Sequence, residues 1–191
     1  MISRTTILIV PGLREHVPEH WQTLLAAKLP KVRTVPPLEQ DKLSCAARVQ
    51  ALEDALAAIS GPVILAAHSA GVMMVAHWAA IAPRRRPIKG ALLVTPADVE
   101  TPFPEPYPTR ESLREHGWLP IPRKPLPFPS LLAASRNDPL CEYARAQALA
   151  QHWGSELLDL GEVGHLNPAA GFGDWPQALE LIKRLDQPLA V

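Results

Sequence analysis

Short runs of consecutive apolar residues alternate with segments of helical periodicity along almost the whole chain. The apolar runs lie at 6–10, 63–67, 91–94 and 131–135, and the more polar segments 156–160 and 32–35 are also interpreted as strands. A strand with one solvated face alternates apolar and polar residues, whereas a strand buried on both faces does not. The pattern therefore predicts an α/β protein with a mostly parallel central sheet and helices on both faces.

The segments between these runs carry apolar residues at helical spacing. We expect helices over 18–29, 45–59, 71–81 and 140–153, and a last helix after residue 174. Ser44 is suited to cap the second helix, because its hydroxyl can accept a bond from a free backbone N–H. Asp174 is suited to cap the last helix, and Pro176 is tolerated in its first turn. In such sheets the loops at the carboxyl ends of the strands carry function.

Composition limits the classes of partner. The 191 residues include 19 Lys and Arg and 19 Asp and Glu, so the formal net charge is zero. A nucleic-acid-binding protein would need a basic excess, and the three arginines at 84–86 are interpreted as a solvated helix end. No apolar run approaches the roughly 18 residues of a membrane span, and the first apolar run is too short for a secretion signal. We expect one cytoplasmic domain, 1–191, that binds neither nucleic acid nor membrane.

One serine stands at the junction between a predicted strand and a predicted helix. Ser69 lies in "AAHSAGV", with Ala67 two residues before it and Gly71 two residues after it. This is a relaxed form of the G-x-S-x-G nucleophile elbow, a sharp turn that needs small neighbours. The N-terminus of the following helix favours a developing negative charge. Ser69 is therefore the candidate nucleophile.

A serine hydroxyl needs a base, and the base needs an acid that fixes its tautomer. His165 follows the last predicted strand, so it is expected at the same sheet edge as Ser69. His68 adjoins Ser69, but successive side chains leave a turn in different directions, so we interpret it as a packed or hydrogen-bonded neighbour. Asp138 follows the preceding strand and is the candidate acid, although it could instead cap a helix. Asp98 is the alternative acid or a turn former.

Two backbone N–H groups are candidates for an oxyanion hole, which stabilises the tetrahedral intermediate of acyl transfer. Ala70 follows the nucleophile directly. Leu13 follows the Pro-Gly turn after the first predicted strand. His16, in the same loop as Leu13, could contact a substrate.

Four motifs extend from residue 10 to residue 176. They are "VPGL" with "PEHWQ", "AHSAG", "LPFPSLLAASRNDP" and "GHLNPAAGFGDWP". Together they resemble the small α/β-hydrolases grouped with the retinoblastoma-binding serine hydrolase. The resemblance implies a compact α/β-hydrolase fold without a large cap domain, with Ser69, Asp138 and His165 as a catalytic triad. That family also includes members discussed as protein-binding partners.

Two segments are distinctive. The residues at 14–17, "REHV", stand where small polar residues tend to follow "PGL" in that family, so their bulk and charge are expected to narrow the pocket or change its substrate. Segment 96–129 is rich in proline and aromatic residues. We expect it to form a rim or short lid over the acyl pocket, with Trp118 as a pocket residue. The alternative is a surface loop packed by its own aromatics.

The sequence leaves three hypotheses on function open. The first is a serine hydrolase that cleaves carboxylic esters, or amides, through an acyl-Ser69 intermediate and needs no metal or organic cofactor. The second is a protein-binding module on a hydrolase scaffold with a relict triad, because fold alone does not establish function. Haloperoxidase or lyase chemistry on the same residues is a third, weaker hypothesis. The acyl group and the oligomeric state are left open.

Overall fold

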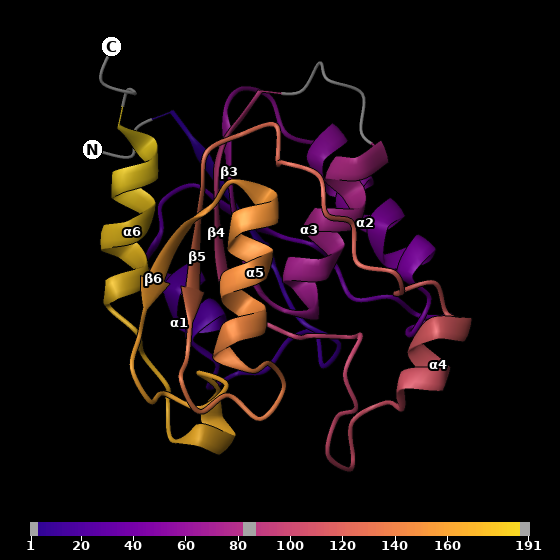
Figure 1. Ribbon diagram of the computed structural model, residues 1–191. Helices are drawn as coiled ribbons and strands as arrows, with labels where there is room; N and C mark the ends of the chain where they lie inside the picture. Colours follow the sequence, from indigo (N-terminus) through magenta and orange to yellow (C-terminus); the bar gives the residue numbers. More distant parts are fainter. Residues whose placement is uncertain (1–3, 82–86, 188–191) are drawn as a thin grey trace.

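A single parallel sheet forms the centre of the molecule. The computed structural model describes residues 4–81 and 87–187, and within them the sheet has six strands, in the order β2-β1-β3-β4-β5-β6. Figure 1 labels four of these strands, β3 to β6. They are β1 (Thr6–Val10), β2 (Val32–Thr34), β3 (Val63–Ser69), β4 (Ile88–Pro96), β5 (Ser130–Ala134) and β6 (Glu156–Asp159). Every neighbouring pair runs parallel. The predicted α/β architecture is confirmed. The arginines at 84–86, interpreted from the sequence as a solvated helix end, lie outside the described residues.

Helices cover both faces of the sheet, as predicted (Figure 1). One face carries α1 (Trp21–Lys28) and α6 (Gln177–Asp186), and the other carries α2 (Cys45–Ala57), α3 (Ala70–Ile81) and α5 (Tyr143–Trp153). Alternate strand residues enter the two cores: Ile7 and Ile9 join α1 and α6, while Leu8 and Val10 join the opposite layer. Both faces are apolar, so the strands show no alternation in sequence. Across the described ranges, no helix is long and apolar enough to cross a membrane.

The two predicted helix caps had different outcomes. Ser44 caps α2 as expected, because its hydroxyl accepts a 3.2 Å bond from the N–H of Ala47. The prediction for Asp174 was wrong, since α6 begins after Pro176 and has no side-chain cap. Asp174 lies too far before the first turn of α6 to reach its free N–H groups, and it binds Lys28 at 2.6 Å instead.

Segment 96–129 is more ordered than its proline content suggested. It contains a short helix, α4 (Arg110–Glu115), whose N-cap Thr109 accepts a 3.1 Å bond from the N–H of Ser112. Leu113 and Trp118 are fully buried and join the core on the α2, α3 and α5 side of the sheet. The segment is therefore a packed extension of the core rather than a separate cap domain.

The strand order creates a crevice between β1 and β3. The chain leaves β1 toward α1 on one face and leaves β3 toward α3 on the opposite face. The carboxyl ends of parallel strands at such a switch point are where ligands bind in open α/β sheets. In this chain the position holds Ser69 at the end of β3 and the loop that follows Val10 at the end of β1.

Candidate active site

Ser69 is held in a strained turn. It is the last residue of β3, α3 begins at the next residue, and its φ angle is +59°. A residue with a side chain rarely adopts this left-handed conformation, and such strain gathers at functional sites. The first N–H groups of α3 have no intrahelical partner. The hydroxyl thus stands on a turn of the geometry expected for a nucleophile elbow.

Gly71 shows why this turn needs a glycine. A Cβ atom built at Gly71 would lie 2.2 Å from the carbonyl oxygen of Val10 and 2.8 Å from that of Pro11. From the sequence we expected the residues two positions before and after Ser69 to come close to each other, so that bulky side chains there would clash. The structure shows that the close approach is instead to the backbone at the end of β1. Gly71 therefore sets the distance between the serine turn and the loop after β1.

A continuous chain of hydrogen bonds joins the three predicted triad side chains. The Oγ of Ser69 lies 2.8 Å from Nε2 of His165, and Nδ1 of His165 lies 3.0 Å from each carboxylate oxygen of Asp138. Donation from Nδ1–H to Asp138 leaves Nε2 free to accept the serine proton. His165 and Asp138 are almost completely buried. Asp138 also accepts a 2.9 Å bond from the N–H of Leu140. The same carboxylate therefore stabilises the local turn and contacts His165.

Two buried side chains hold the backbone of His165. His68 donates from Nε2 to the His165 carbonyl at 2.8 Å, and the hydroxyl of Thr95 donates to the same oxygen at 3.2 Å. Burial, reinforced by the neighbouring His165 and His20, keeps the pKa of His68 well below its usual range, so its imidazole is neutral. Thr95 has a φ of +40° where the β3–β4 register shifts. No local sequence pattern indicated Thr95, whose role arises from the bulge between β3 and β4.

The alternative acid lies elsewhere. Asp98 is fully buried and binds Arg145, with Nε at 2.7 Å and Nη2 at 3.0 Å from its two oxygens. This carboxylate is therefore part of an ion pair with Arg145, and the carboxylate that contacts His165 is that of Asp138.

The loop after β1 faces Ser69. A Cβ at Gly12 would lie 3.3 Å from the Cβ of Ser69, so this loop approaches the nucleophile closely. Arg48, from α2, donates to the carbonyl of Leu13 at 3.3 Å and to that of Lys42 at 2.8 Å, and it lies 3.5 Å from the carboxylate of Glu15. Arg48 is only 5% exposed. The sequence did not single out Arg48, yet it anchors the loop that carries the Leu13 N–H.

A cavity of about 360 Å³ opens beside Ser69 and His165, and Leu13 and Ala70 line it as well. One wall comes from segment 96–129, through Phe103, Tyr107, Leu113 and Trp118, and is apolar and aromatic.

Two sequence predictions concern single residues of this cavity. Trp118 lines it as expected, and its Nε1 donates to the carbonyl of Leu43 at 2.7 Å. The prediction for His16 is corrected, because Glu15 and Val17 line the cavity while His16 is exposed outside it. The φ angle of Glu15 is +60°, and the turn at this residue directs the side chains of Glu15 and Val17, and not that of His16, toward the cavity.

His20, which the sequence did not single out, also lines the cavity. It is the N-cap of α1, and its Nδ1 accepts a 3.2 Å bond from the N–H of Gln22. Burial, together with the positive charge that His165 can carry, lowers the pKa of His20 to about 4. The ring centroids of His20 and His68 lie 4.5 Å apart, and those of His68 and His165 lie 4.8 Å apart. A row of two neutral imidazoles therefore backs His165.

The two cysteines do not offer a second nucleophile. Both Cys45 and Cys141 are buried and free, and burial raises the pKa of Cys45 to about 12 and also raises that of Cys141. A thiol becomes reactive through its thiolate form, which burial disfavours here. In the part of the chain that the structure describes, no group of three or more His, Cys, Asp or Glu side chains is arranged to hold a metal ion.

Comparison with known proteins identifies the family. A sequence profile described as serine hydrolase matches residues 7–184. The chain belongs to the serine hydrolase family. No curated protein gave a significant match to this hydrolase.

Solved structures agree with the family and the fold. A protein of Pectobacterium atrosepticum described as a YdeN-like hydrolase is 34% identical, with a TM-score of 0.81, over 97% of the hydrolase and 92% of that chain. The ydeN gene product of B. subtilis is 16% identical, with a TM-score of 0.70, over 96% and 98% of the two chains. Est1E of Butyrivibrio proteoclasticus, with ferulic acid bound, is 14% identical, with a TM-score of 0.67, over 97% and 88%. The last two likenesses concern the fold alone.

Proposed function

We propose that this serine hydrolase cleaves carboxylic esters, or amides, through an acyl-Ser69 intermediate, with Ser69, His165 and Asp138 as its catalytic triad. The observation that carries the proposal is the unbroken hydrogen-bonded chain from Asp138 through His165 to Ser69, at the wall of a cavity. Four sequence motifs resemble those of the small hydrolases that include the retinoblastoma-binding serine hydrolase, and we propose that the chain is related to them.

The first half of the reaction forms the acyl-enzyme. As the Ser69 oxygen attacks the substrate carbonyl, Nε2 of His165 takes the serine proton, and the carbonyl π electrons move to the oxygen. Asp138 accepts from Nδ1–H throughout, so it stabilises the imidazolium without taking the proton. The tetrahedral intermediate then collapses: the bond to the leaving group breaks, and Nε2–H gives its proton to the departing oxygen or nitrogen. The acyl group remains on Ser69.

The second half repeats these steps with water as the nucleophile. His165 takes a proton from the water that attacks the acyl carbon, and returns it to the Ser69 oxygen as the acid departs. The oxyanion of both tetrahedral intermediates accepts from the backbone N–H groups of Leu13 and Ala70. Ala70 stands at the start of α3, where the helix dipole also favours negative charge.

The cavity favours an apolar or aromatic acyl group. Its wall from segment 96–129 brings the rings of Phe103, Tyr107 and Trp118 to the same space as Ser69. A cavity of about 360 Å³ is within the range of small-molecule sites. Segment 96–129 thereby acts as the rim of the acyl pocket, and we expect nitrophenyl esters of medium or aromatic acids to be better substrates than acetate esters.

A fluorophosphonate probe tests the proposal against a relict triad. The probe phosphonylates a serine only where the hydroxyl is activated. We expect it to label the wild type, and to label neither Ser69→Ala nor His165→Ala. Ser60→Ala and His152→Ala, at exposed positions, serve as controls and should be labelled like the wild type. A folded wild type that stays unlabelled would leave a protein-binding module as the better hypothesis.

A further inference from the structure

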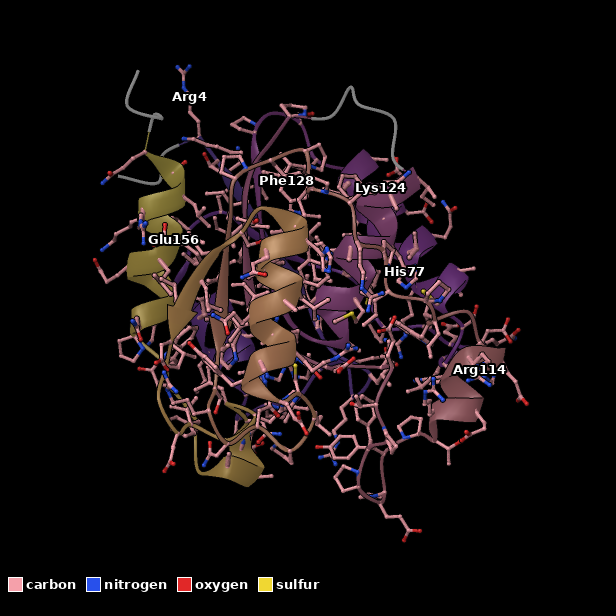
Figure 2. The ribbon with its side chains drawn as sticks, in the orientation of Figure 1. Arg4, His77, Arg114, Lys124, Phe128 and Glu156 are labelled. Carbon is pink, nitrogen blue, oxygen red and sulfur yellow. The ribbon has the colours of Figure 1, made fainter. Side chains whose placement is uncertain are left out.

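A second cleft lies against the helix that forms part of the cavity wall. Its volume is about 560 Å³, and its charged side chains are Glu100, Arg110, Arg114 and Arg145. Leu113 of the same helix, α4, lines the catalytic cavity instead. Arg114 and α4 lie on the side of the molecule away from α6 (Figures 1 and 2). The cleft is therefore separate from the cavity at Ser69 and shares one helix with it.

One of the three arginines is already neutralised. Arg145 binds both oxygens of Asp98, and its Nη2 lies 2.7 Å from Glu100. Glu100 also binds Arg123 through both of its oxygens and accepts a 3.0 Å bond from the N–H of Ile121. These bonds, the one from Arg123 first, lower the pKa of Glu100 to about 2. The carboxylates of Asp98 and Glu100 thus neutralise the guanidinium groups of Arg123 and Arg145. Both oxygens of Glu100 are already occupied by these bonds, so it does not pair with the other arginines of the cleft.

The other two arginines lack acidic partners. Arg110 and Arg114 are four residues apart, so they share a face of α4. Among residues 4–81 and 87–187, the structure gives neither side chain an ion pair or a hydrogen bond. The Nε of Arg110 is moreover buried without an acceptor. A buried donor of a charged group is costly when it is left unpaired. The cleft therefore presents two positive charges and at least one orphaned donor.

We propose that this cleft binds the phosphate group of a small phosphorylated molecule. A phosphate monoester carries about −1.5 to −2 charges at pH 7, so it can pair with the guanidinium groups of both Arg110 and Arg114, whereas a carboxylate carries only one charge. Planar guanidinium forks also suit the several oxygens of phosphate better than ammonium groups do. The cleft is larger than the phosphate alone requires, so it has room for the remainder of a small ligand.

The site is independent of the proposed hydrolase chemistry. Arg110 and Arg114 touch neither Ser69 nor the triad, and the cleft would bind phosphate even if the triad were relict. The cleft and the catalytic cavity nevertheless share α4. Leu113 lies between Arg110 and Arg114 in the sequence of this helix, and it lines the catalytic cavity. A bound phosphate would fix the helix that carries this part of the cavity wall.

Isothermal titration calorimetry with glycerol phosphate and with inorganic phosphate tests the site. The titrations are run at fixed ionic strength with chloride, because salt screens exposed charges. We expect saturable binding of one glycerol phosphate per chain to the wild type, and at least tenfold weaker binding to Arg110→Gln/Arg114→Gln. Arg4→Gln/Arg33→Gln removes the same charge at exposed positions away from the cleft, and it should bind like the wild type. Lysine at both cleft positions should give intermediate affinity.

Three results would overturn the proposal. The first is an absence of saturable binding to the wild type. The second is equal weakening in the control double variant, which would indicate a response to net charge. The third is binding to vesicles that contain phosphatidic acid together with none to glycerol phosphate, which would indicate a lipid surface. Urea unfolding of each variant verifies that altered binding does not reflect loss of the fold.

Discussion

Replacing Gly71 by alanine should lower kcat strongly while it lowers the free energy of unfolding only modestly. The added Cβ would lie 2.2 Å from the carbonyl oxygen of Val10, whereas real Cβ contacts stay above 3.0 Å. The end of β1 and the start of α3 must therefore separate by about 0.8 Å. That displacement moves Ser69 away from the loop that carries the Leu13 N–H. A shift of about 1 Å in a catalytic group can cost about 10²-fold in rate.

The expected change in stability is smaller because two effects oppose each other. Alanine is favoured over glycine in a helix by up to about 1 kcal/mol. Overpacking of a well-packed site costs about 1–3 kcal/mol, and the contact at Gly71 is with backbone, which cannot move aside as a side chain end can. We therefore expect Gly71→Ala to lose about 1–2 kcal/mol in the free energy of unfolding and about 100-fold in kcat.

Urea unfolding and steady-state hydrolysis of a nitrophenyl ester measure the two quantities. Gly90→Ala is the matched control. Its added Cβ would lie 2.9 Å from Cδ2 of Leu185, the movable end of a side chain, and it is remote from Ser69. That variant should keep the wild-type kcat. If Gly71→Ala retained the kcat and the stability of the wild type, the role assigned to Gly71 in spacing the serine turn from β1 would be refuted.

Three further predictions concern other parts of the site. Arg48→Lys keeps a charge but loses the fork that holds the carbonyls of Leu13 and Lys42, so kcat should fall about tenfold or more at nearly constant KM, as measured by steady-state kinetics. Asp138→Asn should lower kcat by about 10⁴ with little change in Tm, because the wrong His165 tautomer is favoured; an unchanged kcat would exclude Asp138 as the acid. His20 has a folded pKa of about 4, below its ordinary value of 6.5, so folding becomes less favourable as pH falls from 6.5 to 4. Its contribution to the slope approaches about 1.4 kcal/mol per pH unit, and urea unfolding of His20→Asn, which keeps an N-cap acceptor, should show a shallower pH dependence; parallel curves would contradict this.

The sheet could be predicted because its determinants are local. Each central strand is apolar on both faces, and the helices between them have their own periodicity, so the order of elements follows from short windows of sequence. The same locality explains why Ser69 and His165 could be placed at one edge of the sheet. Ser69 is the last residue of β3 and His165 lies in the loop after β6, and the carboxyl ends of parallel strands lie on the same side of the sheet.

The features that were missed depend on contacts between distant residues. Arg48 lies 35 positions from Leu13, and no local pattern marks its guanidinium as an anchor. Thr95 acts through a bulge whose register depends on how β3 and β4 pair. His16 was placed in the pocket because it is near the loop after β1, but the turn at Glu15 decides which side chains of that loop face inward. Closeness in the sequence was sufficient to predict where the backbone of this loop lies, but not to predict which way its side chains point.

The hydrogen bonds from His68 and Thr95 to the His165 carbonyl bear on how local unfolding of β6 affects the position of His165. The loop that carries His165 follows β6, which is only four residues long and forms one edge of the sheet. Edge strands open more easily than central ones. His68 and Thr95, however, belong to the central strands β3 and β4. The loop with His165 thus follows an edge strand, but its backbone is held by the central pair β3 and β4, so we expect local opening of β6 to leave the imidazole in place.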